Sequence, residues 1–232
     1  MSSLDDLSGR KRAILIAAEK CFAEQSYQGV SIRDIAHEAG VPVALVGYYF
    51  GAKNELYHAI YEHHSSYIAE RLSELRRARL HTDPAIALNA IIAAFISPVL
   101  KLNEQDHGVN FSRIVMRGVV DRHEASDRIT REFYDPMARE FIDALSGALP
   151  SAPKATVFWC YQFALGALLH HVVDTRMERL SEGLCPARNA EVATPHLLRF
   201  ITAGILAAAQ TGQTTQMVTL TDTPPVRTEN TH

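Results

Sequence analysis

The chain has few of the features that mark secreted, disulfide-bonded or membrane-spanning proteins. It contains only three cysteines, Cys21, Cys160 and Cys185, and their spacing does not recur. An odd number of unpatterned cysteines argues against a disulfide scaffold and favours a reducing compartment, so we expect a cytoplasmic protein. The N-terminal sequence lacks a long apolar segment followed by a small-residue cleavage site, and it therefore predicts no signal peptide.

Long apolar segments are also scarce. The most membrane-like one, PAIALNAIIAAFISPVL at residues 84–100, is interrupted by Asn89, Ser97 and Pro98. It falls short of a full membrane span, so we expect a buried helix and no membrane partner.

The chain also lacks a large excess of either acidic or basic residues. The net charge of −3 excludes a simple polycation. Residues 10–53 nevertheless carry six basic and four acidic side chains, which is a weak electrostatic indication of nucleic-acid binding. Sequence motifs are therefore needed to determine whether the chain binds nucleic acid.

What the chain does contain indicates a folded, helical protein. Hydrophobic residues make up 47% of it, with only 12 glycines and 10 prolines. No segment alternates apolar and polar residues with the period of a strand, and the sequence therefore predicts an all-α fold.

Three short helices are predicted near the N-terminus. The first spans about residues 9–25, with Ser8 available as its N-cap. Ser31 caps a second helix that Gly40 ends in a left-handed conformation. Pro42 lies at or near the start of a third, which ends by Gly51. A helix, a tight glycine turn and a second short helix form a helix-turn-helix.

Two stretches make this assignment specific. SIRDIAHEAGV, followed by YYFGAKNELY, resembles the DNA-binding domain of the TetR family of bacterial repressors. The resemblance covers about residues 10–60, and the matching positions are Ala17, Ala18, Phe22, Ser31, Ile35, Ala36, Ala39, Gly40, Val41, Tyr49, Phe50, Lys53 and Leu56. The sequence departs from the family pattern at Pro42, Gly47 and Ala52, which leaves the operator sequence undefined.

The resemblance implies a domain organisation. An N-terminal DNA-binding domain, residues 1–60, is joined by one long helix over about residues 53–80 to a helical domain, residues 61–210, that binds a ligand and dimerises. Residues 211–232 lack aromatic side chains, and we expect a disordered tail there.

The family pattern also predicts which residues contact DNA: Ser31, Arg33, Val43, Ala44, Leu45, Gly47, Tyr48, Tyr49 and Lys53. Ser31, Lys53 and a tyrosine hydroxyl suit phosphates, whereas Arg33 alone can bind a guanine edge with two hydrogen bonds. Val43, Ala44 and Leu45 can contact thymine methyl groups. Two alternatives stay open, namely that Tyr49 packs in the core and that Arg33 is only a solvated surface residue.

Basic residues at the start of the first helix, Arg10, Lys11 and Arg12, allow two interpretations. They form either a basic arm along the DNA backbone or minor groove, or an ordinary exposed helix start.

The rest of the chain predicts further helices over about residues 84–102, 108–122, 124–149 with a bend at Pro136, 151–178 and 195–210. The last two contain small residues, Ala164, Gly166 and Ala167 in one and Ala203, Gly204, Ala207 and Ala208 in the other. We expect these helices to pair with those of a second copy in a homodimer; the alternative is packing within one subunit.

The resemblance implies a small hydrophobic ligand, acyl or aromatic, in the second domain. The candidate residues are Phe95, Phe111, Val115, Phe133, Met137, Trp159, Phe163 and His170, any of which can instead be plain core. The eleven histidines show no metal-ligand spacing, so we predict no metal and no cofactor.

Together these features predict a ligand-responsive repressor that binds a palindromic operator as a dimer and is released by its ligand. The alternative is a DNA-binding regulator without small-molecule control, acting through a protein partner or as an activator. No local motif indicates a catalytic site, and we expect no enzyme activity.

Overall fold

The computed structural model describes residues 2–121, 123–174 and 176–210, and the segments that it describes contain helices and no strands. The expected all-α fold is therefore confirmed. The expected disordered tail lies outside the described residues.

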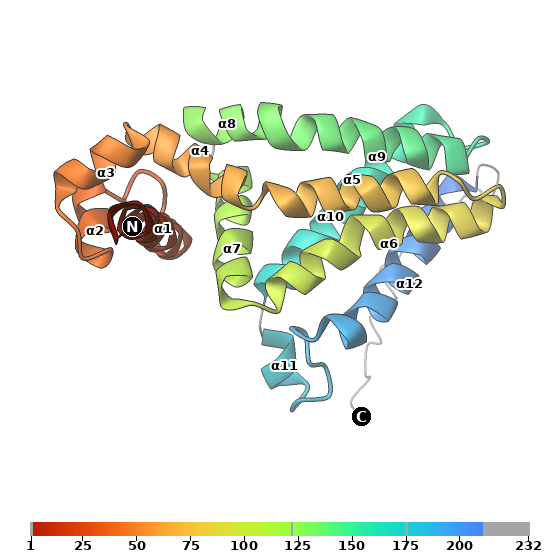
Figure 1. Ribbon diagram of the computed structural model, residues 1–232. Coiled ribbons are helices and arrows are strands. Elements are labelled where there is room, and N and C mark those ends of the chain that lie inside the picture. Colours follow the sequence, from red (N-terminus) through yellow and green to blue (C-terminus); the bar gives the residue numbers. More distant parts are fainter. Residues whose placement is uncertain (1, 122, 175, 211–232) are drawn as a thin grey trace, which may run out of the picture.

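Four helices form the N-terminal unit at one end of the molecule (Figure 1). They are α1 (Ser2–Glu24), α2 (Ile32–Glu38), α3 (Val43–Phe50) and α4 (Lys53–His63). Helices α2, α3 and α4 each pack against α1 through an apolar cluster that includes Ile14, Phe22, Ile35, Val46 and Leu56. The packing thus fixes α3 against the other helices while leaving its outer face free.

Local sequence explains the turns of this unit. Ser31 and Asp34 form a capping box at the start of α2, as the sequence predicted for Ser31. Gly40 and Gly51 have φ angles of 65° and 71°, a region where a side chain is strained; Gly40 follows the C-cap of α2, and Gly51 is the C-cap of α3. The prediction for Ser8 was wrong, because α1 begins at Ser2 and residue 8 lies inside it.

A single connecting helix over residues 53–80 was also wrong. Helix α4 ends at His63, and α5 (Ser65–Ala78) starts after His64, whose φ and ψ of −91° and 5° are not helical. The His64 side chain is buried and bonded to Glu19 of α1, which accounts for the break at this residue. The predicted domain boundary near residue 60 lies close to this break and remains a prediction.

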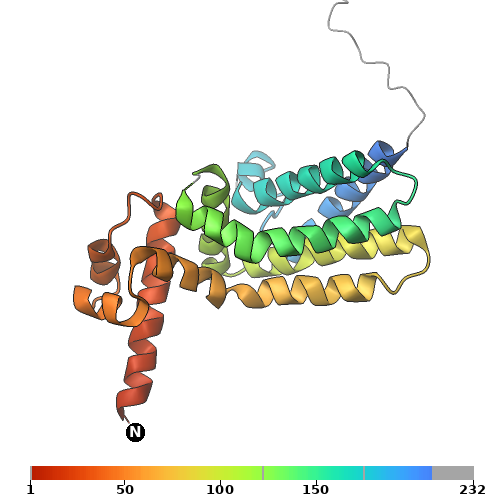
Figure 2. The same ribbon diagram turned by 90° about the horizontal axis from the view of Figure 1, so that it is seen from above.

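The second unit comprises α6 (Pro84–Asn103), α7 (Asp106–Val120), α8 (Glu124–Ile129), the π-helix η1 (Thr130–Tyr134), α9 (Asp135–Ala148), α10 (Lys154–Val173), α11 (Arg176–Leu180) and α12 (Ala190–Ala209). Helices α8, η1 and α9 run beside α4 and α5 in both views (Figures 1 and 2). Helix α12 packs against α6 and α10.

Three expected boundaries in this unit need correction. The helix expected over residues 124–149 changes to π geometry directly before Pro136, since proline has no N–H to continue the α-helical hydrogen bonds. The next helix ends at Val173 rather than near residue 178. The last begins at Ala190, because the Asn189 side chain caps it by accepting a hydrogen bond from the Val192 N–H, and Pro195 is accommodated inside it.

Three helices, α6, α10 and α12, are long and apolar enough to cross a membrane by length and composition alone. For α6 this corrects the expectation that residues 84–100 fall short, because the helix continues to Asn103. Its side chains form the core of the second unit, with Leu88, Ile92 and Ile96 almost completely buried. Helices α10 and α12 differ, since each keeps large apolar side chains on its surface.

Candidate DNA-binding surface and ligand cavity

The outer face of α3 carries four of the predicted DNA-contacting residues. Val43, Ala44, Gly47 and Tyr48 follow one another at helical spacing and are all exposed, whereas Val46 faces the core. Tyr48 is 78% exposed. Arg33 is exposed on α2, which packs against α3. We call these five exposed residues the reading face; they are apolar except for one guanidinium and one phenol.

Ser31 also lies at the surface, but its hydroxyl is engaged. It donates to the Asp34 carboxylate over 2.7 Å and accepts from the Asp34 N–H over 3.2 Å. The Asp34 carboxylate also accepts the Ser31 N–H over 2.8 Å, and these hydrogen bonds lower the pKa of Asp34. Ser31 therefore stabilises the start of α2 in the absence of DNA.

Two other predicted contacts are partly withdrawn from the surface. Leu45 and Tyr49 are half-buried against the core of the N-terminal unit. The Tyr49 hydroxyl is buried and has no hydrogen-bond partner among the described residues. The Tyr49 ring packs edge-on against the ring of Tyr48, with centroids 5.3 Å apart. The geometry favours the core interpretation of Tyr49.

Lys53 joins two parts of the N-terminal unit. Its ammonium donates to the carbonyl oxygens of Tyr27 and Val30 over 2.9 and 3.0 Å, and it lies 4.4 Å from the centroid of the Tyr27 ring. The side chain thereby fixes the loop between α1 and α2 to the start of α4. It can still approach a phosphate, but its principal contacts here are internal.

The basic residues near the start of the chain are helical. Arg10, Lys11 and Arg12 are exposed on α1, which favours the exposed-helix interpretation over an extended arm. Lys11 lies with its ammonium 5.6 Å from the centroid of the Phe50 ring at the end of α3.

A cavity of about 220 Å³ lies where the second unit meets α4 and α5. Its walls come from α4–α10, and most of the lining is apolar. Three of the predicted ligand residues, Phe111, Val115 and Met137, line it. Further apolar lining is supplied by Val99, Leu102, Ile129, Leu165, Leu168, Leu169 and Val172.

The other five predicted ligand residues lie outside the lining. Phe95 is buried behind Arg71, and Phe133 packs against the rings of His58 and Tyr61. Trp159, Phe163 and His170 lie on the outer face of α10, with Trp159 and Phe163 stacked on each other. The structure thus does not bring these three together with the cavity.

Four polar residues lie at one part of the cavity, and the sequence interpretation missed three of them, Tyr67, Arg71 and Tyr134. Tyr67, Arg71, Tyr134 and Tyr161 all line it, and Tyr67 donates a hydrogen bond to the Tyr134 hydroxyl over 2.8 Å. Burial lowers the pKa of Arg71 and raises the pKa of each of the three tyrosines. Within the described part of the chain, no group of three or more His, Cys, Asp or Glu side chains is placed to hold a metal ion.

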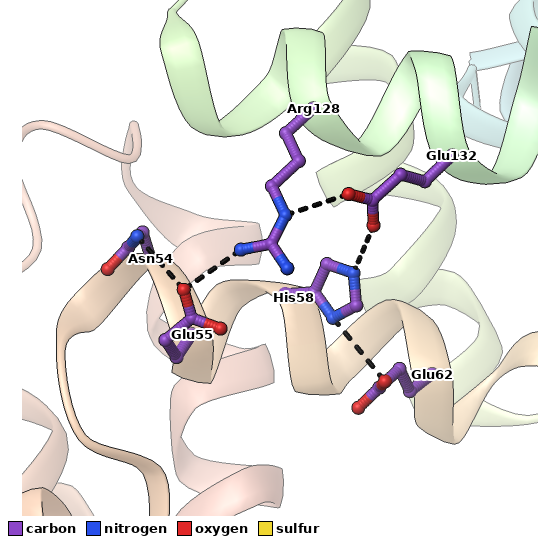
Figure 3. Close-up of polar contacts among 6 residues, drawn as sticks. All are labelled: Asn54, Glu55, His58, Glu62, Arg128 and Glu132. Atoms are coloured by element: carbon purple, nitrogen blue, oxygen red, sulfur yellow. Dashed lines mark hydrogen bonds and ion pairs between the residues drawn. The ribbon is translucent and has the colours of Figure 1, made fainter.

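A cluster of charged residues connects one cavity wall to α4 (Figure 3). Arg128 bonds to Glu132 and to Glu55 of α4, each over 2.9 Å. Glu132 in turn lies 2.6 Å from a ring nitrogen of His58, also on α4. His58 and Arg128 together lower the pKa of the Glu132 carboxyl. Ile129 and Thr130, which lie between these residues in sequence, line the cavity, so one segment contacts both the cavity and α4.

A second connection passes through the buried His64. Its ring stacks on Phe111 of the cavity lining, with centroids 4.1 Å apart, and its Nε2 lies 2.8 Å from the Glu19 carboxylate of α1. Arg117 of α7 also reaches α1, donating to the carbonyl oxygens of Ala23 and Glu24. Hence α1 and α4 of the N-terminal unit both contact walls of the cavity directly.

Comparison with known families now identifies the class. Residues 14–60 match the family model for bacterial regulatory proteins of the tetR family, and residues 93–204 match the model for the tetracyclin repressor-like C-terminal domain. The chain belongs to the TetR family of DNA-binding transcriptional regulators.

Individual relatives are distant. The chain is 27% identical over 132 residues to the HTH-type transcriptional dual regulator CecR of Shigella flexneri, across 55% of this chain and 59% of that protein. It is 33% identical over 87 residues to the HTH-type transcriptional activator FasR of Mycolicibacterium smegmatis, across 37% of this chain and 38% of that one. The chain therefore spans less than two thirds of either curated relative.

A solved structure shares the fold. A crystal structure of a HlyIIR mutant protein superposes with a TM-score of 0.57 and 19% identity, covering 85% of this chain and 97% of that one. At this identity the likeness concerns the fold alone.

Proposed function

We propose that this regulator is a cytoplasmic repressor that binds a palindromic operator as a homodimer and is released by a small hydrophobic ligand. The observation that carries the proposal is the apolar cavity, whose walls contact α1 and α4 of the N-terminal unit. A cavity of this kind, mostly apolar with a few convergent polar groups, is typical of small-molecule sites.

The proposed mechanism follows from those contacts. A ligand that fits the cavity better in one arrangement of α7, α8 and η1 shifts the protein toward that arrangement. Because these walls contact α1 and α4, the shift changes the distance between the two reading faces of a dimer. A coupling free energy of about 1–3 kcal/mol is typical of such control and suffices for induction.

Dimerisation is supported by the surface of α10 and α12. Trp159 and Phe163 on α10 and Phe200 on α12 are 61%, 68% and 70% exposed, and α10 packs beside α12. Exposed aromatic side chains grouped on neighbouring helices typically mark a protein–protein interface. The proposed partner is the same surface of a second copy, forming a bundle of four helices around a two-fold axis.

The reading face supports a division of labour on DNA. Val43, Ala44 and Tyr48 can pack on thymine methyl groups and follow groove shape, while Gly47 permits close approach of the α3 backbone. Arg33 is the proposed base reader.

Replacing Arg33 by alanine is expected to weaken specific binding by ~1–3 kcal/mol and to relax the preference at one base pair. Lys53→Ala is the matched comparison, since it removes another cation of the same unit. This substitution should lower the thermal stability and reduce the affinity for all DNA sequences alike, because Lys53 holds the loop carbonyls of Tyr27 and Val30. Binding measured by fluorescence anisotropy on a set of single-base variants distinguishes the two. Identical profiles for both variants would refute the proposed reader.

Ligand control is tested on the same DNA. We expect salt-sensitive binding to a duplex recovered from a random pool, and release of that duplex by some members of a small-molecule library. Salt-sensitive binding that no compound alters would favour the second candidate, a regulator that acts through a protein partner or as an activator. The names of the two curated relatives, a dual regulator and an activator, keep that candidate in view.

A further inference from the structure

The cavity contains a positive charge that no acidic side chain among the described residues neutralises. Arg71 is only 3% exposed, and its Nε and Nη2 atoms are buried without a hydrogen-bond partner. Burying an unpaired guanidinium is costly, so a folded protein normally supplies a carboxylate or carbonyl for it. Asp135 is the other charged residue of the lining, and it forms no ion pair with Arg71. None of the residues that the structure describes supplies this partner, and we therefore assign the role to a ligand.

The surroundings of Arg71 fix its orientation. The guanidinium carbon lies 4.5 Å from the centroid of the Phe95 ring and 5.3 Å from that of Phe141. These rings hold the planar group by cation–π contacts, which satisfy part of its charge but none of its N–H donors. The side chain is thus positioned before any ligand binds.

The identity of the two free atoms indicates the shape of the partner. The N–H bonds of Nε and Nη2 point in the same direction from one edge of the guanidinium, and a carboxylate accepts both with its two oxygens. Tyr134 adds a donor nearby, because its hydroxyl already accepts from Tyr67 and its own hydrogen remains available. A single buried cation balances one negative charge, which favours a carboxylate over a doubly charged phosphate.

We propose that the ligand of the cavity is an amphipathic organic acid whose carboxylate binds the Nε–Nη2 edge of Arg71. Its hydrocarbon part occupies the apolar remainder of the cavity along Val99, Val115 and Leu168. This inference rests on the proposed ligand control and specifies the chemical class of the ligand.

The test compares acids with their neutral esters. Decanoate and 4-phenylbutyrate, each with its methyl ester, are titrated into the full-length protein by isothermal calorimetry, and Arg71→Met and Arg76→Met are titrated in parallel. Arg76 lies exposed on the same helix, so its replacement is the matched control. Wild type and R76M should bind at least one acid ~10-fold or more tighter than its ester, a tenfold ratio being what one charge-assisted hydrogen bond provides. The R71M variant should lose this preference.

Folding of the variant is checked separately. Methionine fills much of the arginine volume without a charge, so unliganded R71M should melt no lower than wild type. An Arg71→Lys variant, which keeps the charge but not the paired donors, should show an intermediate preference for the acid.

Three results would overturn the inference: equal affinity for acid and ester, an undiminished preference in R71M, or no binding of either acid. The same ligands are then tested for release of DNA. Release by an ester but by neither acid leaves the proposed ligand control intact and removes the carboxylate inference. Arg71-dependent binding of an acid without any change in DNA affinity supports the carboxylate inference and contradicts the proposed ligand control.

Discussion

Replacing Phe163 by glutamate is expected to convert the proposed dimer into monomers and to weaken binding to the proposed operator by ~100-fold or more. Phe163 is exposed on α10 and stacks on Trp159, so a charge there leaves the monomer core untouched. In a two-fold interface it would place like charges from both copies at one apolar surface. Each monomer would then hold only one half-site. Sedimentation velocity and anisotropy on an operator duplex measure the two effects.

Leu80→Glu is the matched control for this substitution. Leu80 is 80% exposed, compared with 68% for Phe163, but it follows α5, outside α10 and α12. It should remain dimeric and bind DNA as wild type does. A Phe163→Glu variant that stays dimeric and retains full affinity would show that α10 does not form the interface.

The second large effect is expected at the break between α4 and α5. His64→Leu should lower the free energy of unfolding by about 3 kcal/mol, because it leaves the Glu19 carboxylate buried without its partner. Glu19 is 4% exposed, and its other oxygen already lacks a hydrogen bond. Urea denaturation followed by circular dichroism gives the loss of stability.

A double variant separates the lost interaction from general damage to packing. Glu19→Met combined with His64→Leu removes both polar groups and should recover much of the stability lost in the single variant. If the double variant is as unstable as the sum of both single ones, the Glu19–His64 hydrogen bond contributes nothing and the packing of His64 on Phe111 accounts for the effect.

The local signals in the first sixty residues were enough to predict α2 and α3. The capping residue Ser31 and the glycines at 40 and 51 act within a few residues of themselves, so their effects on α2 and α3 are visible in the sequence. The exposed stripe of α3 follows from helical spacing. The internal role of Lys53 does not, since its partners Tyr27 and Val30 are distant along the chain.

Long-range contacts explain what could not be predicted after α3. The helix expected from residue 53 to 80 breaks because His64 is bonded to Glu19, which lies on α1. Among the aromatic candidates, only the packing of whole helices decides that Phe111 faces the cavity while Trp159 and Phe163 face outward.

The burial of Arg71 could have been predicted from the pattern of apolar residues in α5. Its buried residues Tyr67, Arg71, Leu75 and Ala78 share one helical face, and an arginine on that face is the anomaly. A charged residue on an otherwise apolar helical face therefore indicates a buried charge, even in a helix with many exposed charges.

Binding of a palindromic operator by a dimer is tested most directly by selecting DNA from a random duplex pool with the purified protein and sequencing what it retains. A dimer with an apolar reading face should enrich an inverted repeat whose half-sites contain thymine steps, together with one guanine contacted by Arg33. Absence of any enriched repeat at low salt would contradict a dimeric, operator-binding regulator.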